Sequence, residues 1–215
     1  MRYGVPFIYS ASERCRKTTL NLQMVFRSDL PTFAKKLVWD LKYCLFGYVQ
    51  SEAPGKTIKY LSTHLKKDSR VLELGCGQGS LLRGVREAGH TYHYCGVDIS
   101  SFAIDKAKAD ADQRTDWVIS DIESFGSPLL WDAILLIESI YYVELGRPPF
   151  LLARWRDMLT DEGFVLIRIH DPVLHDDYVE TLCRIVPHAE VIDASTLVFK
   201  RDALSTRSHA EVTEQ

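Results

Sequence analysis

Three glycines at alternate positions, Gly75, Gly77 and Gly79, follow a short apolar run that begins at Val71. Such a run is typical of a buried strand, and glycines in the turn after it let a ligand approach the backbone closely. Asp98 follows 19 residues after Gly79, at the end of the next predicted strand. In an open α/β sheet, ligands bind beyond the carboxyl ends of the strands, and a carboxylate there accepts ribose hydroxyl hydrogens. Together these residues predict a nucleoside site.

The spacing of the glycines separates two kinds of nucleoside ligand. A pyrophosphate-binding loop usually reads G-x-G-x-x-G and leads a helix N-terminus onto the anion. Here the pattern is G-x-G-x-G, and Glu73 lies two residues before the first glycine. A carboxylate at this position is unfavourable beside a pyrophosphate, but it suits a cationic amino group such as that of S-adenosylmethionine. The pattern therefore favours a sulfonium nucleoside and disfavours a nicotinamide-dependent oxidoreductase.

The stretch Glu73-Leu-Gly-Cys-Gly-x-Gly79 resembles the glycine motif of the class I S-adenosylmethionine-dependent methyltransferases, and the resemblance extends over residues 56–200. It implies a Rossmann-like enzyme that binds S-adenosylmethionine and releases S-adenosylhomocysteine. In that family the motif would hold the methionine end, Asp98 the ribose and Asp121 the adenine amino group. The cofactor-binding residues implied in this way are Glu73, Gly75, Cys76, Gly77, Gly79, Asp98, Ile99, Asp121, Ile122 and Glu138.

Methyl transfer from a sulfonium is an in-line displacement, so the protein must align donor and acceptor, exclude water and accommodate one proton. A base, where one is used, should stand at the carboxyl ends of the fourth and fifth strands. The predicted catalytic residues there are His170, Glu138 and Tyr141. Histidine titrates near neutral pH and suits a general base. The alternatives are that His170 only ends a strand and that Tyr141 or Tyr142 packs in the core; either tyrosine could also bind an amine by cation–π contact.

A second motif bears on the methyl acceptor. Glu138-Ser-Ile-Tyr-Tyr-Val143, with Arg147 shortly after it, resembles a nodulation-type branch of N-methyltransferases that act on an amino sugar. The Asn/Asp-Pro-Pro-aromatic sequence of enzymes that methylate base amino groups is missing after the fourth strand, and Glu138 with Asp171 does not make an octahedral metal site. We expect an amine or hydroxyl of a small molecule as acceptor and no metal. The alternatives are an RNA or protein methyltransferase, or a catalytically silent partner protein with this fold.

Strands and helices alternate after Arg70, which predicts a doubly wound α/β fold. The sheet is expected to have seven strands and to be mostly parallel, with one antiparallel strand near the C-terminus. The predicted strands are 71–74, 92–97, 116–119, 133–137, 163–169, 190–193 and 197–200. The predicted helices between them are 80–88, 100–110, 149–159 and 176–186.

Three segments are predicted along the chain. Residues 1–55 are expected to form an N-terminal helical lid, with a helix over 28–49; residues 56–203 are the Rossmann-like domain, with a first helix over 56–65; and residues 204–215 are a polar tail. The N-terminal aromatic residues are the expected source of acceptor contacts, with a homodimer surface as their alternative role. These residues are Tyr3, Phe7, Tyr9, Phe26 and Phe33.

Composition narrows the classes of protein. The chain has 215 residues, 46% of them hydrophobic, which is enough for one domain with a core. A net charge of −3 disfavours a nucleic-acid partner, which would call for a basic face. Five dispersed cysteines argue against a disulfide framework and a zinc site, so a reducing cytoplasm is expected. No apolar stretch is long enough to span a bilayer, so no membrane partner is expected.

Overall fold

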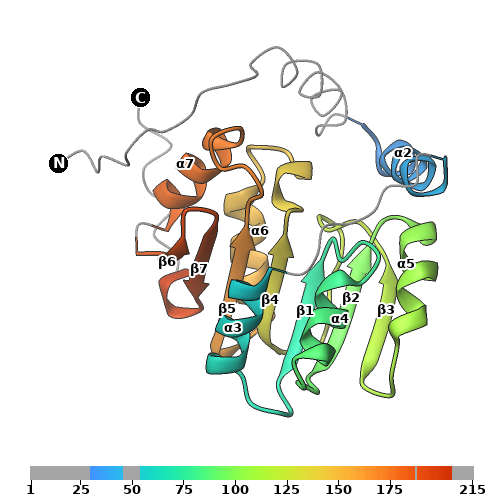
Figure 1. The fold of residues 1–215 in the computed structure, drawn as a ribbon. Helices are drawn as coiled ribbons and strands as arrows, with labels where there is room; N and C mark the ends of the chain where they lie inside the picture. Colours follow the sequence, from blue (N-terminus) through green and yellow to red (C-terminus); the bar gives the residue numbers. More distant parts are fainter. Residues whose placement is uncertain (1–29, 46–53, 187, 205–215) are drawn as a thin grey trace, which may run out of the picture.

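Seven strands form one sheet in the computed structural model, which describes residues 30–45, 54–186 and 188–204 (Figure 1). The strands are β1 (Arg70–Leu74), β2 (His93–Asp98), β3 (Thr115–Ile119), β4 (Trp131–Ile137), β5 (Leu159–Arg168), β6 (Glu190–Asp193) and β7 (Thr196–Lys200). The α-helices are α2 (Thr32–Leu45), α3 (Gly55–His64), α4 (Ser80–Glu87), α5 (Ser101–Ala107), α6 (Pro148–Arg156) and α7 (Asp176–Ile185). Three short 3-10 helices complete the set: η1 (Lys108–Asp110), η2 (Ile140–Tyr142) and η3 (Asp202–Leu204).

The strand order is β3-β2-β1-β4-β5-β7-β6, and β7 runs antiparallel to both of its neighbours. The chain first builds outward from β1 to β3 and then crosses back to place β4 on the other side of β1. Leu72 of β1 therefore pairs with Cys95 of β2 on one side and with Ile134 of β4 on the other. The direction of winding reverses between β1 and β4, which is where ligands bind in doubly wound sheets. The predicted fold class is confirmed.

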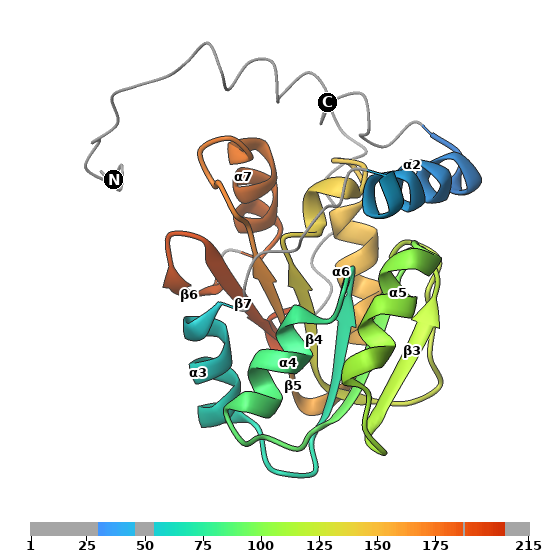
Figure 2. The same cartoon turned by 45° about the vertical axis from the view of Figure 1, so that its right-hand side comes forward.

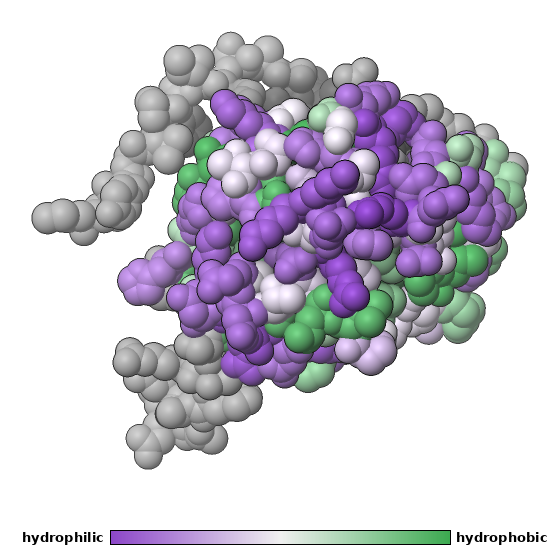
Figure 3. Space-filling view, turned by 90° about the horizontal axis from the view of Figure 1, so that it is seen from below, coloured by the Kyte–Doolittle hydropathy of each residue, from purple (hydrophilic) through white to green (hydrophobic). Residues whose placement is uncertain are grey.

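Helices cover both faces of the sheet (Figures 1 and 2). Leu61 of α3 and Leu82 of α4 pack against one face, and Leu152 of α6 and Leu182 of α7 pack against the other. Residues 133–136 of β4 are fully buried because the strand is covered on both sides. The end of the molecule at which the parallel strands begin, seen from below in Figure 3, presents mainly hydrophilic side chains.

One predicted boundary is wrong. The helix expected to run to Leu159 ends at Arg156, and β5 begins at Leu159 instead of Gly163. Leu159 pairs with Trp131 of β4, and the register shifts between Trp131 and Ala133. In sequence, Leu159 continues the apolar spacing of the preceding helix, but in the structure it pairs with β4. Pairing with a distant strand thus overrides the local pattern.

Close packing of β2 against β3 yields a prediction about stability. A Cβ added at Gly96 would overlap the ring of Trp117 and lie 3.0 Å from the sulfur of Cys76. We expect Gly96→Ala to lower the free energy of unfolding by about 1–3 kcal/mol, because the ring must shift out of a packed layer. Urea denaturation measures this. Gly146→Ala is the matched control, since an added Cβ there meets nothing within 4 Å; equal stability of the two variants would contradict the packing argument.

Candidate functional site

The glycine turn between β1 and α4 is shaped by backbone conformations that only glycine adopts readily. Gly75, Gly77 and Gly79 have φ of 80°, 53° and 77°, in the left-handed region. The backbone N–H of Gly75 donates to the carbonyl of Val97 at 2.8 Å, which ties the turn to β2. A Cβ at Gly75 would lie 2.5 Å from the Cβ of Ser139. The glycines thus let the turn pack closely against its neighbours, and Gly75 stays partly exposed whereas Gly77 and Gly79 are buried.

The carboxylate of Asp98, at the end of β2, is fixed against this turn. It accepts hydrogen bonds from the backbone N–H groups of Gly77 and Ser100, each at 2.9 Å. Burial raises the pKa of Asp98 to about 6, and the nearby charge of Asp40 acts in the same direction. The backbone donors oppose this shift because they stabilise the ionised form. Asp98 is therefore a desolvated acceptor held in one orientation beside the turn.

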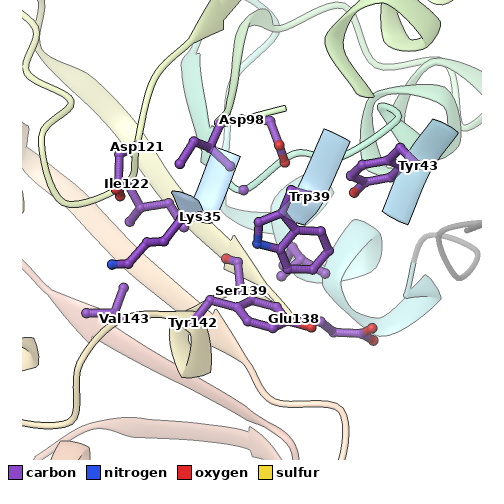
Figure 4. A pocket seen from close by; sticks show the side chains of 13 residues that line it. Lys35, Trp39, Tyr43, Asp98, Asp121, Ile122, Glu138, Ser139, Tyr142 and Val143 are labelled. Atoms are coloured by element: carbon purple, nitrogen blue, oxygen red, sulfur yellow. The ribbon is translucent and has the colours of Figure 1, made fainter. Parts of the chain in front are cut away.

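A cavity opens at the carboxyl ends of the parallel strands, under helix α2 (Figure 4). About 710 Å³ of empty space lies inside it, part of which is open solvent. The lining residues come from α2, the glycine turn and the segments that follow β2, β3 and β4. They are Lys35, Trp39, Tyr43, Gly75, Asp98, Ile99, Asp121, Ile122, Ile137, Glu138, Ser139, Tyr142 and Val143.

Six of the ten predicted cofactor-binding residues share this lining: Gly75, Asp98, Ile99, Asp121, Ile122 and Glu138. Glu73, Cys76, Gly77 and Gly79 are not part of it. Gly77 still contributes through its bond to Asp98. Gly79 allows close packing instead, because a Cβ at this position would lie 2.9 Å from the ring of Trp117. The structure thus brings the residues expected at the ribose and adenine into one cavity.

Glu73 is completely buried and does not reach the cavity surface. It shares a face of β1 with Val71, and the hydroxyl of Tyr94 donates to its carboxylate. Its Oε1 has no hydrogen-bond partner among the described residues. Burial raises the pKa of Glu73 to about 8, although the Tyr94 hydroxyl stabilises the ionised form. A cationic group near the turn would favour ionisation of Glu73, so its expected role at the methionine end stays a prediction.

Only one of the three predicted catalytic residues, Glu138, lines the cavity. Glu138 has a φ of 58°, in the left-handed region that glycine favours. Its Oε1 forms an ion pair with Arg168 and lies 3.6 Å from Nδ1 of His170. The His170 side chain is 67% exposed and does not line the cavity. Tyr141 is buried in the core, where its ring stacks on His175 at 4.1 Å. Catalytic roles for His170 and Tyr141 stay predictions.

Helix α2 contributes three lining residues that the sequence reading did not single out. Lys35, Trp39 and Tyr43 are four residues apart, so they lie on one face of the helix. Phe33, an expected acceptor contact, lies on the opposite face, is 75% exposed and does not line the cavity. Tyr3, Phe7, Tyr9 and Phe26 lie outside the described residues. The four-residue spacing within 35–43 was the signal that could have identified the correct face.

Polar contacts hold α2 across the ends of β2 and β3 (Figures 1 and 2). The hydroxyl of Ser100 donates to Asp40 at 2.7 Å, directly beside Asp98. Lys35 forms an ion pair with Glu123 at 3.1 Å, two residues after Asp121. The helix is thus anchored to the same strand ends that carry the predicted nucleoside-binding residues.

Comparison with known proteins agrees with this geometry. The family described as "Methyltransferase domain" matches residues 46–198, more than half of the chain. The protein therefore belongs to the class I S-adenosylmethionine-dependent methyltransferases.

Individual relatives are distant. The chain is 20% identical over 161 residues to (S)-tetrahydroprotoberberine N-methyltransferase of Eschscholzia californica, covering 67% of this chain and 45% of that protein. It is 30% identical over 77 residues to nodulation protein S of Rhizobium tropici, covering 35% of this chain and 32% of the relative. The chain therefore spans less than half the length of either relative, and the second match confirms the predicted likeness to nodulation-type proteins.

A solved structure shows the same fold. The plantazolicin methyltransferase BpumL, in complex with a pentazolic desmethylPZN analog and SAH, superposes with a TM-score of 0.52. It is 20% identical, and the match covers 80% of this chain and 76% of BpumL. Within residues 30–45, 54–186 and 188–204, no helix has the length and apolar character needed to cross a membrane.

The buried acid at position 73 generates a prediction about pH. Its folded-state pKa of about 8 exceeds the ordinary value of 4.5, so the folded protein retains a proton that the unfolded chain has lost. The contribution of Glu73 to stability is therefore complete below pH 4.5 and declines as the pH rises toward 8, by about 1.4 kcal/mol per unit. Glu73→Gln should flatten this decline.

Urea unfolding at pH 5, 6.5 and 8 measures the slope. Glu87→Gln, at the exposed end of α4, is the control and should keep the slope of the wild type. Parallel pH profiles for the wild type and Glu73→Gln would show that Glu73 ionises normally in the folded protein.

Proposed function

We propose that this enzyme transfers a methyl group from S-adenosylmethionine to an amine or hydroxyl of a small molecule. One observation carries the proposal: Gly75 of the glycine turn, the fixed Asp98 carboxylate and the lining residues after β3 and β4 meet in one cavity under α2. This combination offers ribose acceptors and an apolar surface without a cluster of cations for phosphates.

The residues present fit the nucleoside in its expected orientation. Asp98 would accept hydrogen bonds from the ribose hydroxyls, because its carboxylate is desolvated and oriented by two backbone donors. Ile99 and Ile122 line the cavity and would pack against the adenine faces. Asp121 would accept from the adenine amino group. Gly75 brings its backbone into the cavity lining. Glu73, buried behind the turn with a raised pKa, would ionise in response to a cationic group at the methionine end.

S-adenosylmethionine, when bound, supplies a methyl carbon attached to a positively charged sulfur. The acceptor lone pair forms the new bond to this carbon while the carbon–sulfur bond breaks and its electron pair passes to sulfur. The protein's own contribution is alignment and exclusion of water. Trp39 and Tyr142 cover the cavity from α2 and η2. Glu138 is the carboxylate in the lining after β4, and we assign it the proton that the acceptor releases.

The size and surroundings of the cavity support a small acceptor. Aromatic side chains restrict the space beyond the nucleoside-binding residues, and the acidic net charge gives no attraction for an RNA backbone. Two distant relatives point in the same direction by name, one being an N-methyltransferase of (S)-tetrahydroprotoberberine and the other a methyltransferase of plantazolicin. A cytoplasmic location and a homodimer remain predictions.

Isothermal calorimetry tests the cofactor assignment. The wild type is expected to bind S-adenosylhomocysteine and to show no measurable binding of NADH. Asp98→Ala should weaken the binding of S-adenosylhomocysteine by roughly 1–3 kcal/mol, because the ribose hydroxyls lose a buried acceptor. Asp105→Ala is the matched control, since Asp105 is exposed on α5 and pairs with Lys108. Preferential binding of NADH would overturn the proposal, and unchanged affinity of Asp98→Ala would remove Asp98 from the ribose site.

A further inference from the structure

Three aromatic side chains from two parts of the chain meet in the cavity. Trp39 and Tyr43 come from α2, and Tyr142 comes from η2, directly after β4. The rings of Trp39 and Tyr142 lie 4.7 Å apart, edge to face at 90°, and those of Trp39 and Tyr43 lie 5.9 Å apart at 34°. These three residues, here called the aromatic wall, present ring surfaces at different orientations to one space.

The aromatic wall lies beside a carboxylate. In the view of Figure 4, Tyr43 and Glu138 lie on one side of Trp39, whereas Lys35 and Asp121 lie on the other. The side with Asp121 carries the residues expected at the adenine. The side with Glu138 carries the lining residues that follow β4, which is where the acceptor of a methyl group is expected.

The electrostatics of this second side favour a cation. Aromatic ring faces carry negative potential and attract ammonium groups within about 6 Å of the ring centroid. Trp39 already makes such a contact, because Nζ of Lys42 lies 4.2 Å from its ring centroid. Lys42 is not among the residues that line the cavity. The Glu138 carboxylate in the lining can accept hydrogen bonds from an ammonium group, and Arg168 orients it by an ion pair at Oε1.

We propose that the aromatic wall and Glu138 form a subsite for a cationic amine, so that the methyl acceptor is an amine that binds as an ammonium ion. This inference rests on the proposed function and narrows it. A neutral hydroxyl gains much less from ring faces and a carboxylate than an ammonium does. Before transfer the ammonium gives one proton to Glu138, which restores the nitrogen lone pair. The nitrogen then bonds to the methyl carbon as the carbon–sulfur bond breaks toward sulfur, and the product is an N-methylated ammonium.

Two probes of equal shape and different charge test the subsite. Choline carries a quaternary ammonium, and 3,3-dimethyl-1-butanol is its neutral carbon analogue. Binding of each to protein saturated with S-adenosylhomocysteine is followed by tryptophan fluorescence and by calorimetry. We expect choline to bind roughly tenfold more tightly than its neutral analogue. Equal or weaker binding of choline would overturn the inference, and this comparison needs no variant that might fold poorly.

Variants locate the preference. Trp39→Leu and Tyr142→Leu should each lower the affinity for choline roughly fivefold to tenfold. The affinity for 3,3-dimethyl-1-butanol should change little. Phe33→Leu, on the exposed opposite face of the same helix, is the control and should bind both probes as the wild type does. A choline affinity unaffected by both aromatic substitutions would also overturn the inference.

The two proposals fail in different ways. If S-adenosylhomocysteine does not bind in calorimetry, the proposed function fails, and a choline preference measured without it still supports a cation subsite. If S-adenosylhomocysteine binds and choline shows no preference, the methyltransferase assignment stands and only the amine subsite is rejected.

Discussion

The site depends on the attachment of the glycine turn to the end of β2. Two backbone N–H groups converge on the Asp98 carboxylate, and the turn itself donates to Val97. This attachment buries a carboxylate next to a second buried acid, Glu73, and both have pKa values raised by burial. The protein therefore accepts an electrostatic cost where ligand groups are expected, and hydroxyl donors or a cation would reduce that cost.

Helix α2 extends the same attachment outward. Ser100 donates its backbone N–H to Asp98 and its hydroxyl to Asp40 of α2, so Ser100 connects the end of β2 to the helix that covers the cavity. Lys35 of α2 makes a second connection, because it forms an ion pair with Glu123 in the segment that follows β3. These contacts lie beside Asp98 and Asp121, which line the cavity, so the position of α2 is tied to the strand ends. The aromatic wall is complete only when α2 lies against the segment after β4.

The sheet and the residues that line the cavity at the ends of β1, β2 and β3 were largely predictable because their signals are local. Apolar strands, the glycine turn and acids at strand ends each occupy a few consecutive residues, and the topology of doubly wound sheets brings those ends together. The boundary of β5 and the position of Phe33 were not predictable in the same way. Leu159 follows a distant partner strand, and the choice between the faces of α2 marked by Phe33 and Trp39 depends on docking across the sheet.

The backbone at Glu138 has a consequence for how this chain can vary. A left-handed φ of 58° at a residue with a long side chain costs about 1–3 kcal/mol, and glycine would remove that cost. Glycine at this position would also remove the carboxylate from the cavity lining and its pair with Arg168. Selection for heat resistance alone would therefore favour glycine at position 138, which removes a charged group from the cavity lining. Selection for turnover would favour a different residue there.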